Sequence, residues 1–263
     1  MPLLRNLLCI AALILLAAPE GLRADNHSDP YTVLITGANR GMGLEFARQY
    51  AALGYRVIAT ARSPERAEDL NALAADDPDV TVIQLDVTDH ARIEEIAEQY
   101  RGSPIDILVN NAGVSGAKSR NEFGRIDYEL FNLAIAVNTY GPIKMAEAFM
   151  PHIKASRQKK IIAVSSNMSS ITNTDGGIYI YRVSKAALNM AYHNLSEDFR
   201  ADEVIVGLVT PPRTATEFQP PGTDMSKLPS AKDSVAGMIR IIDEFSLENS
   251  GAFYGDKGKE LPW

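Results

Sequence analysis

Short apolar runs alternate with longer amphipathic stretches through most of the chain. The apolar runs lack polar alternation, which is typical of strands buried on both faces of a parallel sheet. The stretches between them repeat apolar residues three and four positions apart, as an amphipathic helix does. We therefore expect strands at residues 31–35, 56–61, 80–85, 105–109, 160–165 and 204–209, with a short one at 252–254.

Capping residues indicate where several helices begin and end. The first helix follows residue 43 and should end near Gly54, which suits a C-terminal cap. Ser63 followed by Pro64 predicts the start of a second helix, and Asp89 opens a third that runs to residue 100. Further helices are expected at 127–154, interrupted at Gly141-Pro142, at 179–201 and at 231–245, with an irregular loop at 211–230.

This order of elements predicts the fold class. Strands separated by helices form a parallel sheet, so we expect an α/β protein with a single Rossmann-like, doubly wound parallel sheet and helices on both faces. A length of 263 residues with 46% apolar content suits one such domain, which we place at residues 25–263.

The first 24 residues have a different pattern, and we interpret residues 1–24 as a secretory signal peptide. Arg5 gives a positive start, an unbroken apolar stretch runs from residue 7 to residue 18, and the small residue Ala24 suits a cleavage site. The alternative is an uncleaved membrane anchor, although about a dozen apolar residues fall short of the roughly 20 that span a bilayer. We therefore expect an exported protein, periplasmic or secreted, with no stable membrane span after cleavage.

Composition argues against several classes of site. Cys9 is the only cysteine and lies in the expected signal peptide, so the mature domain has no disulfide and no thiolate nucleophile. The four histidines have no ligand spacing, and we expect no metal site. A net charge of -7 without runs of Lys or Arg argues against nucleic acid as a partner.

Residues 36–43 connect the first apolar run to the first helix and contain Gly37, Gly41 and Gly43. Glycines let a strand-to-helix turn pass close to a ligand, and the helix N-terminus attracts phosphate. The spacing, Gly-x-x-x-Gly-x-Gly, differs from the Gly-x-Gly-x-x-Gly fingerprint but meets the same physical requirements. The turn therefore predicts a dinucleotide site, with tight packing as the alternative explanation for the glycines.

The end of the second expected strand indicates which dinucleotide fits. An acidic residue there would bind the ribose 2′-hydroxyl of NAD, whereas arginine accommodates the 2′-phosphate of NADP. The sequence has Ala61 followed by Arg62, and Arg40 lies inside the glycine turn. Two guanidinium groups and no carboxylate favour NADP(H) as the cofactor. The alternative is that both arginines are ordinary solvated side chains.

Two tyrosines are followed by a lysine four residues later, which places each pair on one helix face. A nearby ammonium lowers the pKa of a phenol, so that the tyrosine can act as a general acid or base. The pair of Tyr140 and Lys144 spans Gly-Pro, and we interpret it as a chance match. The pair of Tyr181 and Lys185 begins a helix and follows a serine-rich strand end at residues 165–170, from which a hydroxyl could meet Tyr181 over a substrate carbonyl.

Together the motifs resemble those of the short-chain dehydrogenase/reductase family. They are Thr36-Gly37-x-x-x-Gly41-x-Gly43, Asn110-Asn111-Ala112-Gly113, Val137-Asn138, Ser165-Ser166 and Tyr181-x-x-x-Lys185, in that order. Residues 174–177 and 258–263 look like the C-factor and Sniffer-type carbonyl reductase branch. The resemblance implies an NADP(H)-dependent enzyme that transfers hydride between nicotinamide and a small-molecule carbonyl or secondary alcohol. The alternative is a cofactor-binding signalling protein of the C-factor type, in which turnover is incidental.

The resemblance also implies catalytic roles. Tyr181 would be the general acid/base, Lys185 would lower its pKa and hold the nicotinamide ribose, and Ser166 would polarise the carbonyl. Asn138 would hold a water that links Lys185 to solvent as a proton relay. A homodimer through residues 127–154 and 179–201 is what the family suggests.

The implied cofactor-binding residues come from six parts of the chain. Arg40 and Arg62 would contact the adenosine phosphates, Asp86 the adenine, and Asn110 the central part of the cofactor. The full set is Gly37, Arg40, Gly41, Met42, Gly43, Arg62, Asp86, Asn110, Ala112, Gly113, Tyr181, Lys185, Thr214 and Thr216.

Three features depart from the family pattern. Pro211-Pro212-Arg213 replaces the frequent Pro-Gly after the sixth strand, and Thr214 or Thr216 should still meet the nicotinamide amide or the diphosphate. Ser166 lies 15 residues before Tyr181, slightly more than usual, which leaves Ser169 as the alternative catalytic serine. The expected signal peptide has no twin arginine, so the chain should cross the membrane unfolded and without cofactor. An exported enzyme would then need a source of reduced cofactor outside the cytoplasm.

Overall fold

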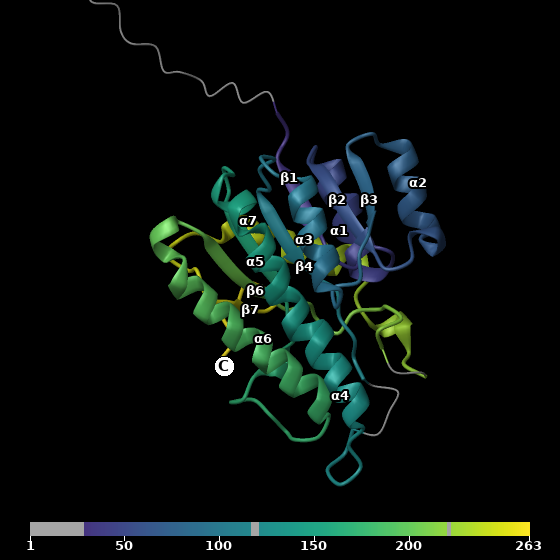
Figure 1. Ribbon diagram of the computed structural model, residues 1–263. Coiled ribbons are helices and arrows are strands. Elements are labelled where there is room, and N and C mark those ends of the chain that lie inside the picture. The colour runs from purple at the N-terminus through teal and green to yellow at the C-terminus, as the bar shows by residue number, and fades with distance from the viewer. Residues whose placement is uncertain (1–28, 117–120, 220–221) are drawn as a thin grey trace, which may run out of the picture.

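The computed structural model describes residues 29–116, 121–219 and 222–263. The expected signal peptide therefore lies outside the described residues. Seven parallel strands form one sheet in the order β3-β2-β1-β4-β5-β6-β7 (Figure 1). The strands are β1 (Thr32–Ile35), β2 (Arg56–Ala61), β3 (Val80–Gln84), β4 (Ile107–Asn110), β5 (Lys160–Val164), β6 (Ile205–Val209) and β7 (Phe253–Tyr254).

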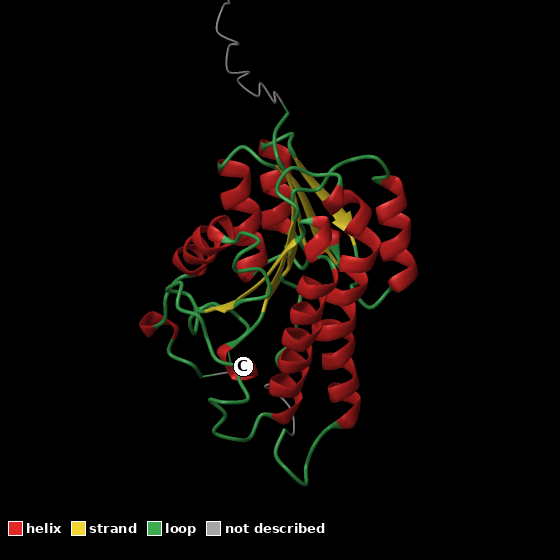
Figure 2. Ribbon diagram, turned by 90° about the vertical axis from the view of Figure 1, so that its left-hand side faces the viewer, coloured by secondary structure: helices red, strands yellow, loops and turns green. Residues whose placement is uncertain are grey.

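Helices cover both faces of the sheet, and Figure 2 shows the sheet nearly edge-on between them. On one face lie α1 (Gly41–Ala52), α2 (Glu68–Asp76) and α7 (Ala231–Glu244). On the other face lie α3 (His90–Gln99), α5 (Gly141–Lys154) and α6 (Tyr179–Asp198), while α4 (Tyr128–Ile135) packs against α6. These findings confirm the predicted doubly wound α/β fold.

The burial of the strands explains why continuous apolar runs predict them. In β1 the side chains of Val33 and Ile35 pack into the core on the α1 side, whereas Leu34 packs into the core on the α5 side. All three are fully buried. A strand covered on both faces cannot alternate apolar with polar residues, because each face has its own apolar core.

The second helix starts later than Ser63 and Pro64 predicted. Pro64–Arg66 forms only a 3-10 turn, and α2 begins at Glu68. The side chain of Ser63 makes no cap hydrogen bond, and Ala67 has a non-helical backbone, which separates the two segments. The sixth helix also ends earlier than residue 201, because α6 stops at Asp198 and a separate 3-10 turn follows at Arg200–Asp202.

The expected interruption near Gly141-Pro142 is a π-helical turn, Ala136–Tyr140, between α4 and α5. Pro142 lies in the first turn of α5, where its missing N–H is tolerated. An ideal Cβ on Gly141 would lie 2.9 Å from the Cβ of Val87, so glycine lets the helix approach the segment after β3. The long helix therefore continues through the interruption with a changed register, as π-turns do at functional sites.

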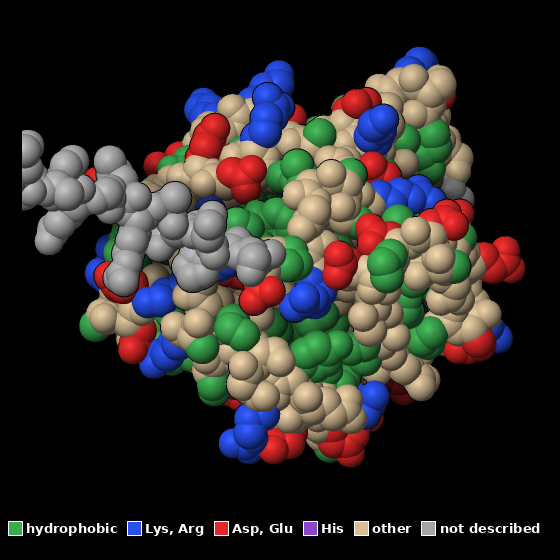
Figure 3. Space-filling model, turned by 90° about the horizontal axis from the view of Figure 1, so that it is seen from above, with side chains coloured by type: hydrophobic (Ala, Val, Ile, Leu, Met, Phe, Trp, Pro, Cys, Tyr) green, Lys and Arg blue, Asp and Glu red, His purple; other side chains and the backbone are tan. Residues whose placement is uncertain are grey.

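Charged side chains of both signs are interspersed on the face seen in Figure 3, which views the molecule from the amino ends of the strands. Within the described parts of the chain, no helix combines the length and apolar character that crossing a membrane requires. The same residues contain no group of three or more His, Cys, Asp or Glu side chains that could hold a metal ion.

Candidate functional site

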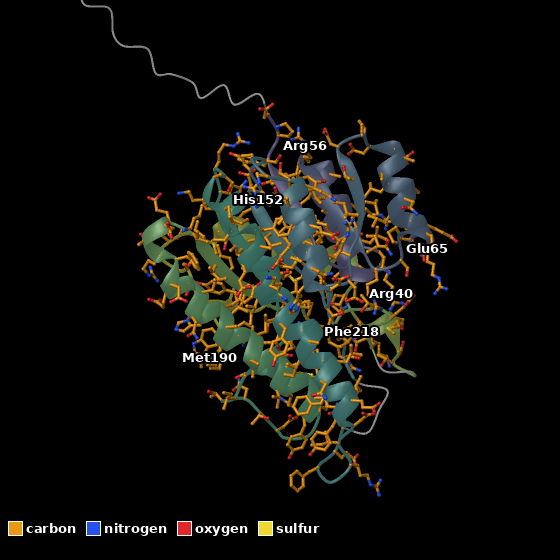
Figure 4. All side chains as sticks on the ribbon, viewed as in Figure 1. Arg40, Arg56, Glu65, His152, Met190 and Phe218 are labelled. Atoms are coloured by element: carbon orange, nitrogen blue, oxygen red, sulfur yellow. The ribbon has the colours of Figure 1, made fainter. Side chains whose placement is uncertain are left out.

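The predicted site residues gather at the carboxyl ends of the strands. The strand order reverses between β1 and β4, and ligands of open α/β sheets bind at such a switch point. The glycine turn follows β1, the segment at residues 110–113 ends β4, and the serine segment at residues 165–170 follows β5. Figure 4 shows Arg40 and Phe218 near each other at this edge, whereas Arg56 and His152 lie at the opposite edge.

The glycine turn is clamped to the end of β4 by Thr36 and Asn111. The Thr36 hydroxyl accepts hydrogen bonds from the backbone N–H groups of Asn111 (3.0 Å) and Ala112 (3.1 Å). In return, the Asn111 amide donates to the carbonyls of Thr36 (2.9 Å) and Gly37 (3.2 Å). Sequence reasoning did not include Thr36 or Asn111 among the site residues. The signal that could have found them is a hydroxyl at the end of one strand and a second consecutive asparagine at the end of the neighbouring strand.

The glycines are required by close contacts rather than by flexibility alone. Gly37 has a φ of +67°, and a Cβ there would lie 2.9 Å from the Cα of Ala112. A Cβ on Gly43 would lie 2.2 Å from the carbonyl oxygen of Gly37. Tight packing therefore forms the turn, and it is compatible with the predicted dinucleotide site.

The start of α1 fits an anionic group. Arg40 is the N-cap residue and makes no side-chain cap hydrogen bond, and the first turn contains no acidic residue. The first N–H groups and the positive end of the helix dipole therefore face the turn without an acidic residue in the first turn of the helix. Met42 is half-buried, and its side chain packs against the core. These features fit the diphosphate of a dinucleotide.

The arginines and Asp86 lie at the rim of the site. Arg40 forms an ion pair with Glu217, and both side chains are mostly exposed. Arg62 is exposed directly after β2. Asp86 is half-buried, and its Oδ1 accepts hydrogen bonds from the backbone (2.9 Å) and the hydroxyl (2.8 Å) of Thr88. Asp86 thus shapes the turn that leads into α3.

Tyr181, Ser166 and Lys185 meet at the end of β5. The Ser166 side chain lies close enough to the Tyr181 phenol to influence its pKa. Burial raises the pKa of Tyr181 to about 12, against the smaller lowering effect of Ser166. Lys185 is buried, and its Nζ donates to the carbonyl of Val164 at 2.8 Å. Burial lowers the pKa of Lys185 to about 8.

The pKa of Tyr181 differs from the expectation that Lys185 would lower it. The Lys185 ammonium is directed to the Val164 carbonyl. Burial therefore dominates the pKa of Tyr181, and the ammonium does not contribute to it. Sequence spacing placed both residues on one helix face correctly, but it could not indicate where the long lysine side chain ends.

Ser166, and not Ser169, faces Tyr181. The Ser169 hydroxyl donates to the backbone carbonyl of Ser166 at 2.6 Å and accepts from the Asn189 amide at 2.7 Å. Asn189 also accepts from Ser165 at 2.6 Å. Ser169 therefore supports the backbone that carries Ser166, and Asn189 ties this segment to α6.

The serine segment is also held from the end of the described chain. The backbone oxygen of Trp263 accepts hydrogen bonds from the N–H (2.8 Å) and hydroxyl (2.6 Å) of Thr172 and from the hydroxyl of Ser170 (3.4 Å). The indole ring packs against Phe253 and His193 at centroid distances of 5.9 Å and 5.3 Å. Trp263 therefore docks the segment after Ser166 against the core.

Asn138 lies in the π-helical turn and is fully buried. Its amide accepts from the N–H of Val114 (2.8 Å) and donates to the Val114 carbonyl (2.9 Å) and the Ser184 hydroxyl (2.9 Å). A Cβ on Gly113 would lie 3.3 Å from Oδ1 of Asn138 and 3.7 Å from Nζ of Lys185. Gly113 therefore leaves space beside both side chains.

Two predicted cofactor-binding side chains are engaged elsewhere. The Asn110 amide donates to the hydroxyl of Tyr192 at 2.6 Å, beneath α6, so only its backbone is placed to face a cofactor. The Thr214 hydroxyl is buried and bonds the Pro212 carbonyl (2.8 Å) and the Ser234 hydroxyl (2.9 Å). Thr216 is the threonine that packs against the glycine turn, with its Cγ2 3.7 Å from an ideal Cβ on Gly41.

The second Tyr-Lys pair lies outside the site. The Lys144 ammonium forms ion pairs with Glu94 and Glu147, and Tyr140 is 55% exposed. The interpretation of this pair as a chance match agrees with these contacts.

Comparison with known proteins identifies the family. The model of the short chain dehydrogenase family matches residues 31–226. C-signal of Myxococcus xanthus is 40% identical over 161 residues, covering 61% of this chain and 93% of that protein. The 1-hydroxy-2-glutathionyl-2-methyl-3-butene dehydrogenase of Rhodococcus sp. (strain AD45) is 33% identical over 236 residues, covering 88% and 99%.

Two solved structures match along most of the chain. NADPH-bound carbonyl reductase from chicken fatty liver has a TM-score of 0.82 at 32% identity, covering 89% of this chain and 100% of that one. Carbonyl reductase Sniffer of D. melanogaster has a TM-score of 0.80 at 25% identity, with the same coverage. These similarities confirm the resemblance to the C-factor and Sniffer branch, and the chain belongs to the short-chain dehydrogenase family of oxidoreductases.

Proposed function

We propose that the protein is an NADP(H)-dependent oxidoreductase that interconverts a small-molecule carbonyl compound and the corresponding secondary alcohol. The observation that carries this proposal is the placement of Ser166, Tyr181 and the buried Lys185 together at the carboxyl end of β5, at the same sheet edge as the glycine turn. The similarity to an NADPH-bound carbonyl reductase supports it.

The bound cofactor would supply or accept the hydride, and the protein's residues would manage the proton. Tyr181 donates its hydroxyl proton to the substrate oxygen during reduction and removes that proton during oxidation. Ser166 donates a hydrogen bond to the same oxygen and orients it. A neutral phenol with a pKa near 12 remains a proton donor over the whole physiological range.

Lys185 would return a proton to Tyr181, and a water held by Asn138 would restore the proton on Lys185 from solvent. The ammonium of Lys185 is charged below its pKa of about 8 and can supply a proton at this end of the site. A water between Lys185 and solvent would donate to the remaining lone pair of the Asn138 Oδ1 and pass protons to Lys185. Reduction should therefore slow as the pH rises through about 8.

The choice of NADP(H) rests on Arg40 and Arg62. No carboxylate ends β2, where Ala61 is fully buried and Arg62 follows it into solvent. A guanidinium binds the 2′-phosphate in a bidentate manner, which NAD(H) cannot use.

The test is a fluorescence titration of the mature protein, starting at Asp25, with NADPH and with NADH. We expect tighter binding of NADPH, and a loss of that preference in Arg62→Ala. Arg56→Ala is the matched control, because Arg56 is exposed at the opposite end of the same strand (Figure 4). If neither nucleotide binds at millimolar concentration, the proposal is wrong.

A second function is favoured by the 40% identity to C-signal. In that case the protein binds the cofactor and acts as a signal, and turnover is incidental. Tyr181→Phe separates the two functions, because it removes the proton donor and leaves the cofactor site. Biological activity that survives this change, with cofactor binding intact, would favour the signalling function.

Export and dimerisation complete the proposal. We propose cleavage after residue 24 and a homodimer formed through the segments at 127–154 and 179–201. Both segments expose apolar side chains, Leu133 and Tyr140 on the first and Val183 and Met190 on the second. Light scattering of the mature protein should give twice the chain mass, and Met190→Glu should reduce it to one chain.

A further inference from the structure

Three consecutive residues after β6 contact three separate parts of the proposed active site. We call Thr216, Glu217 and Phe218 the strap. Thr216 packs on Gly41 of the glycine turn, and Glu217 pairs with the Arg40 guanidinium. The Phe218 ring packs edge-on against the Tyr181 ring, with centroids 5.7 Å apart and planes at 60°. One short segment therefore links the adenosine end of the site to its catalytic end.

The ion pair with Glu217 occupies the Arg40 guanidinium, which the proposed cofactor needs. Arg40 is one of the two arginines we assign to the 2′-phosphate of NADP(H). A carboxylate and a phosphate at one guanidinium repel each other, so the phosphate displaces Glu217 when it binds Arg40. NAD(H) has no group that competes with Glu217.

We propose that Glu217 is a cofactor-specificity residue, which holds the strap closed until a 2′-phosphate takes its place on Arg40. This inference rests on the proposed function and adds a role for a residue outside the cofactor and catalytic sets. Because Glu217 and Phe218 are adjacent, release of the carboxylate also loosens the ring that packs on Tyr181. The 2′-phosphate, which lies far from the chemistry, would thus favour opening of the substrate side.

The exposure of the pair sets the size of the effect. The side chains of Arg40 and Glu217 are 66% and 72% exposed. Such a pair shifts an equilibrium by only about 1.4- to 5-fold, because water screens it. A phosphate carries more charge and three acceptor oxygens, so it can outcompete the carboxylate. The strap therefore tunes affinity and does not block the site.

The test compares Glu217→Gln with the wild type in NADPH and NADH titrations of the mature protein. The dissociation constant for NADPH should fall by about 2- to 5-fold, because the phosphate no longer competes with a carboxylate. The constant for NADH should stay within experimental error. Glu248→Gln is the matched control, since Glu248 lies in the segment between α7 and β7 and has the same charge change. It should bind both nucleotides as the wild type does.

Phe218→Ala tests whether the strap acts as a unit. Phe218 has no charge to compete with the phosphate, yet weakening its contact with Tyr181 should also tighten NADPH binding and leave NADH unchanged. If Glu217→Gln tightens NADPH binding and Phe218→Ala does not, the link to the catalytic end is wrong. If the wild type prefers NADPH but Glu217→Gln binds it no better, the whole inference is wrong while the proposed function stands. If the wild type binds no NADPH, both fail.

Discussion

Replacing Lys185 with methionine should change how the stability of the protein depends on pH. Lys185 has a pKa of about 8 in the folded protein, compared with 10.5 for an unperturbed lysine, because burial disfavours its charge. Between these two values the unfolded chain binds more protons than the folded one, so the wild type gains stability as pH rises. The interval corresponds to roughly 3 kcal/mol, most of which should be recovered between pH 7 and pH 10.

Urea unfolding of the ligand-free wild type and Lys185→Met at several pH values measures this effect. Other lysines and tyrosines also titrate in this range, but they are common to both proteins and cancel in the difference. The free energy of unfolding of the wild type, minus that of the variant, should therefore rise by roughly 2–3 kcal/mol from pH 7 to pH 10. A difference that stays constant with pH would refute the lowered pKa, and with it the proton relay that we assign to Lys185.

Three further predictions concern the site. Tyr181→Phe should lower kcat by about 10²- to 10⁴-fold in a carbonyl reduction assay while NADPH affinity changes little, since it removes only the proton donor; wild-type kcat would contradict this role. Gly43→Ala should abolish NADPH binding and lower the melting temperature, because its Cβ would lie 2.2 Å from a backbone oxygen, whereas Gly255→Ala, whose Cβ would make ordinary contacts at 3.5 Å, should be tolerated. Asn111→Ala should weaken NADPH binding and cost about 1–3 kcal/mol in urea unfolding, because it removes the clamp on the Thr36 and Gly37 carbonyls; unchanged affinity would show that the glycine turn holds its shape alone.

The order of elements could be predicted from the sequence because buried parallel strands and amphipathic helices leave strong local patterns. The bounds of β2 agree with the expected residues 56–61, and α3 is capped by Asp89 as expected, through a hydrogen bond from the Arg92 N–H at 3.0 Å. The errors occur where short-range geometry decides. Pro64 begins only a 3-10 turn and not a helix. The prediction was wrong there because no local sequence pattern reveals the non-helical backbone of Ala67.

The candidate site shows a similar limit. Motif spacing correctly predicted that Ser166, Tyr181 and Lys185 lie together. The orientation of other predicted site residues depends on hydrogen-bond partners from distant parts of the chain. Asn110 turns to Tyr192, 82 positions away in sequence, and Thr214 turns to Ser234. A sequence shows which residue follows a strand but not which of its neighbours takes the hydrogen bond, since those neighbours come from other elements.

The docking of Trp263 has a consequence for when the protein becomes complete. Its backbone oxygen bonds Thr172, 91 positions earlier, and so holds the segment that follows Ser166. During synthesis on the ribosome, the glycine turn and the first strands can form while the later residues are still in the exit tunnel. The serine segment gains this support only after residue 263 has emerged. We therefore expect a nascent chain to arrange its glycine turn before the segment that carries Ser166.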